Sequence, residues 1–253
     1  MTTALTLIGG PTVLIEIDGV KLVTDPTFDP PGAYPSGAIT LRKTRGPALS
    51  AAEIGAVDAV LLSHDQHADN LDPAGRAFLE QARTVFTTPV AQGRLGLGVV
   101  VTPFQDEILK GANGRRLIVT GAPARHGPPG IEPISGPVTG FLLGRDAPGD
   151  AVYVTGDTVW YEGVAEVARR YRPKIVVLFT GSAEPRGKFH MTMDANDALE
   201  AAHAFPEAAI VAVHNDGWAH FIESEAELRQ AFAALGAGER LVALPPGEPV
   251  RFA

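Results

Sequence analysis

A dense group of imidazole and carboxylate side chains between an apolar run and a helix start constrains the fold most. Residues 59–62 read Ala-Val-Leu-Leu, which predicts a short buried strand. His64, His67 and Asp69 follow at once, and Asp72-Pro73 then supplies a helix cap and a first helical residue. Because α/β folds place their chemistry where a strand leads into a helix, this run predicts an α/β chain with its site at a strand end.

The residue types in this run favour a divalent transition metal such as zinc. A solvated turn with surface histidines would be the simpler interpretation of a single His. The spacing His-x-x-His-x-Asp after an apolar strand favours metal binding instead. One turn cannot supply every ligand, so we expect the remaining ligands elsewhere in the chain.

Composition excludes several other classes of protein. The chain has 253 residues, enough for one large domain. Its net charge of −8 and its lack of a basic cluster argue against nucleic-acid binding. It has no cysteine, which excludes disulfides and thiolate ligands. No signal peptide and no run of membrane-spanning length are evident, so we predict a cytoplasmic protein without a membrane span.

Strand-like and helix-like patterns alternate along the chain. Strands are predicted at 4–8, 12–17, 20–24, 59–62, 84–87, 99–101, 107–110, 117–120, 138–143, 151–155, 175–179, 209–213, 241–244 and 250–252, and helices at 74–82, 89–95, 162–171, 193–205 and 223–235. Residues 27–47 read as a long loop, either a lid or a solvated connector. We predict a single domain over 1–253 with two similar halves, 1–140 and 141–253, packed sheet on sheet with helices outside.

Metal-competent side chains recur where these strands end. The set comprises Asp25, the group of His64, His67 and Asp69, then His126, Asp157, His190 and His214. Several such ends in one chain predict a single rim where the sheet edges converge.

This chain-wide order resembles the metallo-β-lactamase superfamily, in particular its branch of ascorbate-6-phosphate lactonase-like and N-acylphosphatidylethanolamine phospholipase D-like proteins. The motifs that carry the resemblance are LVTDP at 22–26, LLSHDQHADNLD at 61–72, PARHG at 123–127, VTGDT at 154–158, HMTMDANDA at 190–198 and VHNDGWAHF at 213–221. The resemblance implies a four-layer αβ/βα sandwich with metals, usually zinc, on its rim.

The resemblance also implies a ligand set. His64, His67 and His126 would hold one metal, Asp69 and His190 a second, and Asp157 would bridge the two. Asp25 would orient a ligand histidine. Three neutral imidazoles leave one position open for a water whose pKa the metal lowers toward ~7.

The turn at 64–70 departs from the family pattern His-x-His-x-Asp-His. One extra residue separates the first two histidines, and Asn70 replaces the last. The first ligand is therefore either Asp65, by register, or His64, if the chain bulges by one residue. Asn is a poor zinc ligand, so the second metal would be weak or absent, and Mn or Fe are alternatives to zinc. We expect one or two divalent metals per chain.

Two further histidines follow the strand predicted at 209–213. We expect His214, His220 or both to line the substrate pocket as proton donor or oxyanion stabiliser. His214 is also an alternative to His190 at the second metal, or a buried strand-end residue bonded to backbone. His203 lies in a helix without polar neighbours and is interpreted as structural.

The function predicted from these features is that of a metal-dependent hydrolase. Metal-activated water would attack an ester, lactone, amide or phosphodiester of a small molecule, with Asp69 or a pocket histidine such as His214 moving the proton. The absence of a Gly-x-Ser-x-Gly elbow and of cysteine fits this chemistry, because no protein nucleophile is needed. The alternative is a binding or scaffold protein that kept the fold and lost catalysis. The oligomeric state stays open, and a homo-oligomer is compatible with the sequence.

Overall fold

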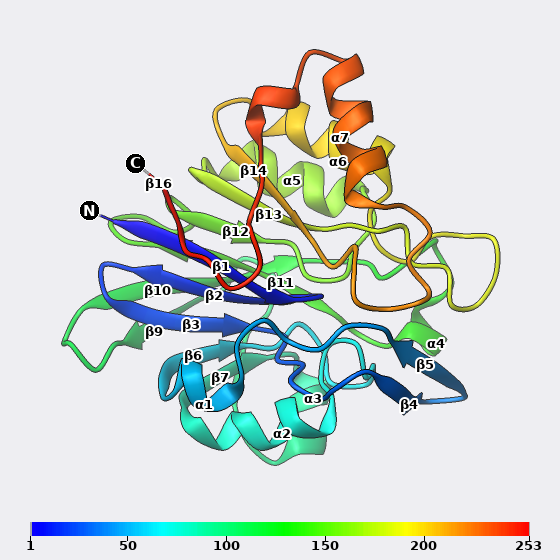
Figure 1. Cartoon of the computed structure of the whole chain (residues 1–253). Helices are drawn as coiled ribbons and strands as arrows, with labels where there is room; N and C mark the ends of the chain where they lie inside the picture. Colours follow the sequence, from blue (N-terminus) through cyan, green and yellow to red (C-terminus); the bar gives the residue numbers. More distant parts are fainter. Residues whose placement is uncertain (1, 253) are drawn as a thin grey trace.

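Two seven-stranded sheets pack face to face, and helices cover the outer face of each (Figure 1). The computed structural model describes residues 2–252. The layers run helix, sheet, sheet, helix, so the αβ/βα sandwich expected from the sequence is confirmed. Each predicted strand and helix is present, with its ends shifted by a few residues.

The first sheet has the strand order β16 (Val250–Phe252), β1 (Thr3–Gly9), β2 (Thr12–Ile17), β3 (Val20–Thr24), β6 (Val57–Leu61), β7 (Ala82–Thr87) and β8 (Val99–Val100). The second has the order β15 (Leu241–Val242), β14 (Ala209–Val213), β13 (Ile175–Phe179), β12 (Val152–Val154), β11 (Thr139–Gly144), β10 (Arg116–Pro123) and β9 (Asp106–Lys110). The helices are α1 (Ala51–Ile54), α2 (Pro73–Phe78), α3 (Pro89–Leu95), α4 (Glu132–Ser135), α5 (Glu162–Arg170), α6 (Ala195–Ala204) and α7 (Glu225–Ala234), with 3₁₀ turns η1 (Leu79–Gln81) and η2 (Gly238–Arg240).

Both sheets repeat one plan. An antiparallel meander comes first, and parallel strands connected through helices follow. The chain changes sheet between Val100 and Asp106. The expected division near residue 140 does not coincide with this change, because the hairpins of β9, β10 and β11 belong to the second sheet. β16 returns to the first sheet.

Three apolar layers hold the sandwich together. The central layer lies between the sheets and includes Ile15, Leu22, Phe141 and Val177. One outer layer packs α1 and α2 against the first sheet, and the other packs α5, α6 and α7 against the second. β6 and β13 are buried at every position, as expected for parallel strands covered on both faces. Among the described residues, none of the helices combines the length and apolar character needed to cross a membrane.

The loop predicted over 27–47 contains a hairpin, which corrects that part of the sequence interpretation. β4 (Gly32–Ser36) pairs with β5 (Ile39–Lys43) around a two-residue turn. Gly37 adopts φ +60° in that turn, a conformation that glycine reaches without strain. The hairpin packs through Leu41 against Ala68 and Trp218, so a tertiary contact stabilises strands that are short in sequence.

A buried ion pair fixes this hairpin to the start of α2. Lys43 Nζ donates to Asp72 Oδ2 at 2.9 Å and to the Thr27 carbonyl at 3.1 Å. Asp72 Oδ1 accepts the backbone N–H of Gly75 at 2.7 Å and so caps the helix. The cap expected at Asp72-Pro73 therefore also anchors a segment 29 residues away along the chain.

We predict opposite effects of alanine at two helical glycines. A Cβ at Gly75 in α2 would lie 1.7 Å from the Pro26 carbonyl oxygen, so Gly75→Ala should lower the free energy of unfolding by about 3 kcal/mol or more. Gly93 in α3 is exposed with nothing within 4 Å, so Gly93→Ala should raise it by roughly 0.5–1 kcal/mol. Urea unfolding of the two variants measures both, and equal effects would contradict this packing.

Candidate metal centre

The polar rim lies where strands of both sheets end. His64 comes shortly after β6, His126 after β10, Asp157 after β12, and His214 directly after β14. All four side chains are buried. The first three belong, with His67, to one group whose ligand atoms all lie within 4.8 Å of one another.

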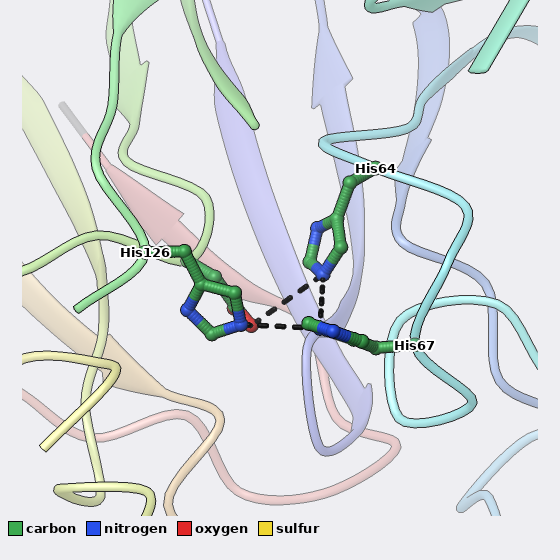
Figure 2. A group of neighbouring side chains, drawn as sticks. His64, His67 and His126 are labelled. Carbon is green, nitrogen blue, oxygen red and sulfur yellow. Dashed lines mark hydrogen bonds and ion pairs between the residues drawn. The ribbon is translucent and has the colours of Figure 1, made fainter. Parts of the chain in front are cut away.

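Three imidazole nitrogens in this group point at one another (Figure 2). His67 Nδ1 lies 2.9 Å from His64 Nε2 and 3.1 Å from His126 Nε2. Ligand atoms at ~2.0 Å from a tetrahedral zinc ion are roughly 3.3 Å apart. The spacing of the three nitrogens therefore suits one cation at their centre.

The hydrogen bond at the far side of His126 fixes where its lone pair points. His126 Nδ1 lies 2.7 Å from the Met191 carbonyl oxygen, which can only accept, so Nδ1 carries the proton. The neutral ring then presents a bare Nε2 to the centre. Burial lowers the pKa of His67 and of His126 to about 4, and it holds the pKa of His64 well below its usual range. All three rings are neutral at pH 7, the form that binds metal.

Asp157 closes the group with an oxygen that receives no hydrogen bond. Its Oδ2 lies 3.4 Å from His126 Nε2 and 3.9 Å from His64 Nε2. Oδ2 is buried and has no donor among the described residues. An unpaired buried carboxylate oxygen is costly unless a cation lies between it and the imidazole nitrogens it faces. The group therefore fits a metal with three nitrogen ligands and one oxygen ligand.

The extra residue in the turn faces away from the centre. Asp65 accepts two hydrogen bonds from the Arg94 guanidinium. Arg94 Nε donates to Asp65 Oδ2 at 2.9 Å, and Arg94 Nη2 donates to Asp65 Oδ1. Arg94 Nη2 also donates to Gln66 Oε1 at 2.8 Å, and Gln66 Nε2 donates to the Ser135 carbonyl at 2.6 Å. The structure thus brings His64 to the centre and turns Asp65 outward, as the bulged register anticipates.

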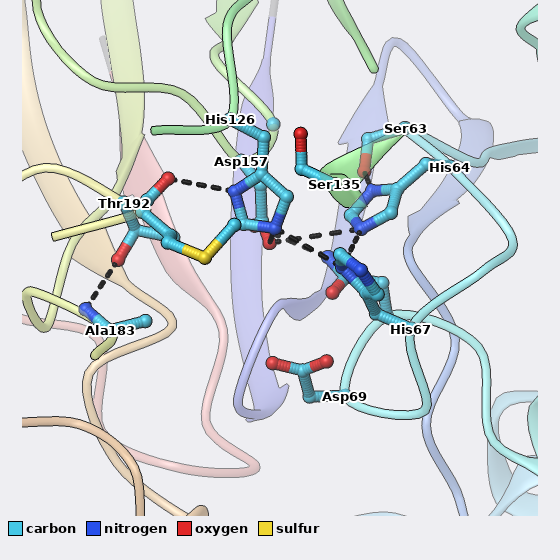
Figure 3. Close-up of polar contacts among 12 residues, drawn as sticks. Ser63, His64, His67, Asp69, His126, Ser135, Asp157, Ala183 and Thr192 are labelled. Atoms are coloured by element: carbon cyan, nitrogen blue, oxygen red, sulfur yellow. Dashed lines mark hydrogen bonds and ion pairs between the residues drawn. The ribbon is translucent and has the colours of Figure 1, made fainter. Parts of the chain in front are cut away.

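The second oxygen of Asp157 faces a different set of side chains. Asn70 Nδ2 donates to Asp157 Oδ1 at 3.2 Å, and His214 Nδ1 lies 3.2 Å from the same oxygen. Asp69 Oδ2 lies 3.6 Å from His214 Nε2 and 2.9 Å from His220 Nε2. In Figure 3, Asp69 lies apart from the three imidazoles. The His214 ring is therefore held between two carboxylates, one at each of its nitrogens.

The charges of this second set follow from that geometry. Burial would raise the pKa of Asp69, but the contacts of His214 and His220 outweigh it and hold the pKa well below the usual range. Burial would lower the pKa of His214, but Asp157 and Asp69 outweigh it and raise the pKa. Burial raises the pKa of Asp157. Asp69 is thus ionised, and His214 favours the charged form.

The structure does not bring His190 into either set. Its Nε2 lies 3.2 Å from Asp197 Oδ2 and its Nδ1 lies 3.8 Å from Asp194 Oδ2, at the start of α6. The neighbouring residue Met191 reaches the centre instead, through its carbonyl bond to His126. His214, the alternative weighed for the second position, is the histidine placed between Asp69 and Asp157. His203 is exposed on α6.

Asp25 supports the centre through backbone rather than through a ligand ring. Its Oδ1 accepts the backbone N–H of Ser63 at 2.7 Å, one residue before His64. Burial and then the charge of Asp157 raise the pKa of Asp25 well above its usual range. Asp25 also adopts φ +28°, a strained value for a residue with a side chain.

A narrow cavity of about 20 Å³ opens onto the imidazoles. This is close to the room that one water needs. Its walls come from the β4–β5 hairpin, from the loop that contains Arg186 and Met191, and from the site residues His67, Asp69, His126 and His220. No sequence pattern indicates the Met191 carbonyl as a partner of His126. The alternation of Ile39 and Leu41 is a strand signal, but it is too short to define the hairpin by itself.

Comparisons with known proteins agree with this geometry. Residues 21–215 match the family described as Beta-lactamase superfamily domain. UPF0173 protein YddR of Bacillus subtilis is 25% identical, covering 98% of this chain and 99% of its own. An uncharacterized protein of Mycobacterium tuberculosis is 28% identical over 82% of this chain, which spans about half of that relative, 53% of its length.

Solved structures match over almost the whole chain. Isothiocyanate hydrolase from Delia radicum gut bacteria has a TM-score of 0.81 at 25% identity, covering 98% of this chain and 99% of its own. A protein from Veillonella parvula, described as a possible metal-dependent hydrolase, has a TM-score of 0.86 at 23% identity and covers 99% of both chains. The latter likeness concerns the fold alone.

We predict that Arg94→Ala weakens metal binding although Arg94 contacts no ligand ring. The change releases Asp65 and Gln66, the two residues between His64 and His67, so those rings lose part of their fixed geometry. Loss of such outer contacts typically costs roughly tenfold or more in metal affinity. Zinc competition with a chromophoric chelator measures the effect. Arg83→Ala, at an exposed position of β7, is the control, and equal affinities of the two variants would contradict this role.

We also predict that the metal-free protein loses stability as the pH falls from about 6.5 to about 4. His67 and His126 take up protons near their ordinary pKa of 6.5 when unfolded, but only near 4 when folded. Within this range the unfolded chain binds more protons, so lowering the pH lowers the free energy of unfolding. Urea unfolding after chelation measures this slope. His126→Gln should give a shallower slope and His203→Gln an unchanged one, and three equal slopes would contradict the assignment.

Proposed function

The chain belongs to the beta-lactamase superfamily, and on this premise we propose that it is a hydrolase that uses one divalent metal held by His64, His67, His126 and Asp157. The observation that carries the proposal is the convergence of three neutral imidazoles on an Asp157 oxygen without a hydrogen-bond donor. Three nitrogen ligands and one oxygen ligand favour zinc over the harder cations. When bound, the metal supplies a Lewis acid that lowers the pKa of water toward neutrality.

We propose one metal per chain because, among the described residues, the side chains around a second position do not form a group of converging ligand atoms. Asn70 donates to the Asp157 oxygen that a bridging role would require. The two nitrogens of His214 face two different carboxylates rather than one common point. A second cation would have to displace the Asn70 amide and turn the His214 ring.

The second set of side chains is suited to move the proton released by water. His220 lines the cavity and contacts Asp69 Oδ2, which in turn lies near His214 Nε2. Asp69 is ionised, and its Oδ1, which has no hydrogen-bond partner among the described residues, can accept a proton, while His214 holds Asp69 and Asp157 in place with its charge. The roles proposed are proton acceptor for Asp69 and electrostatic support for His214.

The cavity points to a small substrate. The room of about 20 Å³ beside the imidazoles holds about one water, so even a small ester, lactone or amide enters only if the hairpin or the opposite loop moves. A bulky phosphodiester is disfavoured. Arg186 also lines this cavity and is positively charged. A substrate with one negative charge could therefore bind beside Arg186.

The structural similarity to an isothiocyanate hydrolase adds isothiocyanates to the classes of substrate to be tested. Isothiocyanates are thin molecules with an electrophilic carbon, which suits a narrow cavity and an activated water. We therefore include phenyl isothiocyanate beside p-nitrophenyl acetate and a small lactone in the substrates to be tested.

Metal content and hydrolysis measured together test the proposal. We expect about one zinc per chain by elemental analysis and hydrolysis of at least one of these substrates, with chelation abolishing the rate. His126→Ala should lose both the metal and the activity, whereas His203→Ala on the exposed face of α6 should keep both. Metal without any hydrolysis would favour the alternative, a binding protein on a hydrolase fold, and absence of metal after reconstitution would overturn the proposal.

Asn70→His separates one metal from two. The substitution replaces the amide that contacts Asp157 with an imidazole, so we expect the metal content to rise from about one toward two per chain. Asn70→Ala removes the amide without adding a ligand and should stay near one. Two metals in the unsubstituted protein would contradict the single-metal assignment while leaving the hydrolase proposal in place.

A further inference from the structure

A second cavity, of about 290 Å³, lies next to the metal centre and shares no lining residue with the narrow one. Two segments, β5 with its continuation to residue 45 and residues 214–220, border both cavities. This volume is near the lower end of the roughly 300–1,000 Å³ common for small-molecule sites. None of the four proposed metal ligands lines it, so the inference below does not rest on the proposed hydrolase activity.

Two buried hydrogen-bond donors on this cavity have no acceptor. Trp218 is 4% exposed, and its indole Nε1 has no partner among the described residues. Asn215 Nδ2 is buried and unpaired in the same way. Both residues line the cavity. Because a buried N–H without an acceptor costs free energy, two such donors at one cavity call for a ligand that accepts.

Neighbouring side chains pack against the Trp218 indole, and backbone hydrogen bonds hold its segment. Lys43 Nζ lies 5.4 Å from the centroid of its ring, and the Tyr34 ring packs edge-on at 5.9 Å. Backbone hydrogen bonds on both sides, from Thr44 N to the Gly217 carbonyl and from Ala219 N to the Arg42 carbonyl, fix the segment.

Gly10 lies beside the indole nitrogen in the wall of the cavity. A Cβ at Gly10 would lie 3.3 Å from Trp218 Nε1, so a side chain there would stand in the way of a ligand oxygen. Gly10 has φ +54° and also lines the cavity.

The charges at this cavity are already paired. Lys43 is paired with the buried carboxylate of Asp72, and Arg45 is paired with Asp216 at the exposed mouth. Much of the remaining lining is apolar, including Leu7, Ile8 and Ala48. The ligand therefore needs an apolar body and one accepting oxygen rather than a high charge.

We propose that this cavity binds a small, largely apolar molecule through a carbonyl or carboxylate oxygen that accepts hydrogen bonds from Trp218 Nε1 and Asn215 Nδ2. It is a binding site separate from the metal centre.

Nuclear magnetic resonance of the two indole N–H groups tests the proposal. The ¹⁵N-labelled protein is titrated with benzamide and with benzoate, and Trp218→Phe assigns the resonances of Trp218 and Trp160. We expect a saturable downfield shift of the Trp218 N–H with at least one probe and none of Trp160, which lies outside this cavity. A shift with benzamide alone identifies a neutral carbonyl ligand, and a shift with benzoate alone identifies a carboxylate.

Calorimetry with matched variants completes the test. Trp218→Phe keeps an aromatic ring but removes the donor, so the dissociation constant of the probe should rise about tenfold. Trp160→Phe should leave the dissociation constant unchanged. Asn215→Ala serves the same purpose if Trp218→Phe does not fold. Absence of a saturable Trp218 shift with both probes, parallel shifts of both indoles, or undiminished affinity of the donor-free variants would overturn the proposal.

Discussion

The buried carboxylate of Asp157, one of whose oxygens is reached by no donor in the described part of the chain, is the constraint on which the rest of the site depends. Its Oδ2 faces the nitrogens of the imidazole group, and its Oδ1 faces Asn70 and His214. Because the groups are buried, each of these arrangements costs free energy unless opposite charges are paired. Neutral rings on one side therefore call for a cation, whereas the raised pKa of His214 on the other side supplies a positive charge from the protein itself.

The turn that contains the first two ligands is held from three directions. Asp25 accepts the N–H of Ser63 before it, Arg94 binds the outward-facing Asp65 within it, and the ion pair of Lys43 with Asp72 ends it. The extra residue relative to the family pattern is thus used as an anchor rather than tolerated as a defect. These protein contacts restrain the turn on both sides of the ligand rings.

The sequence was sufficient for the sandwich, for its strands, and for the residues of the imidazole group, because apolar runs ending in His or Asp report directly on strand ends. It was insufficient where side-chain direction decides. His190 follows a strand as His126 does, yet its ring turns toward the start of α6 and only its neighbour reaches the site. The β4–β5 hairpin escaped notice because its stability comes from Trp218 and Asp72, which lie far away in the sequence. The chain changes sheet between Val100 and Asp106 rather than at the predicted division near residue 140, because β9, β10 and β11 pair in sequence order with β12 of the second sheet.

The position of β16 has a consequence for how the protein forms during synthesis. This strand lies against β1, with Thr3 opposite Phe252 and Leu5 opposite Val250, so it covers an edge of the sheet that is translated first. While the ribosome is still producing the second sheet, the exposed backbone of β1 is open to pairing with another nascent chain. Chaperones that shield strand edges would therefore matter most for this protein late in translation, after most of its core residues have already emerged.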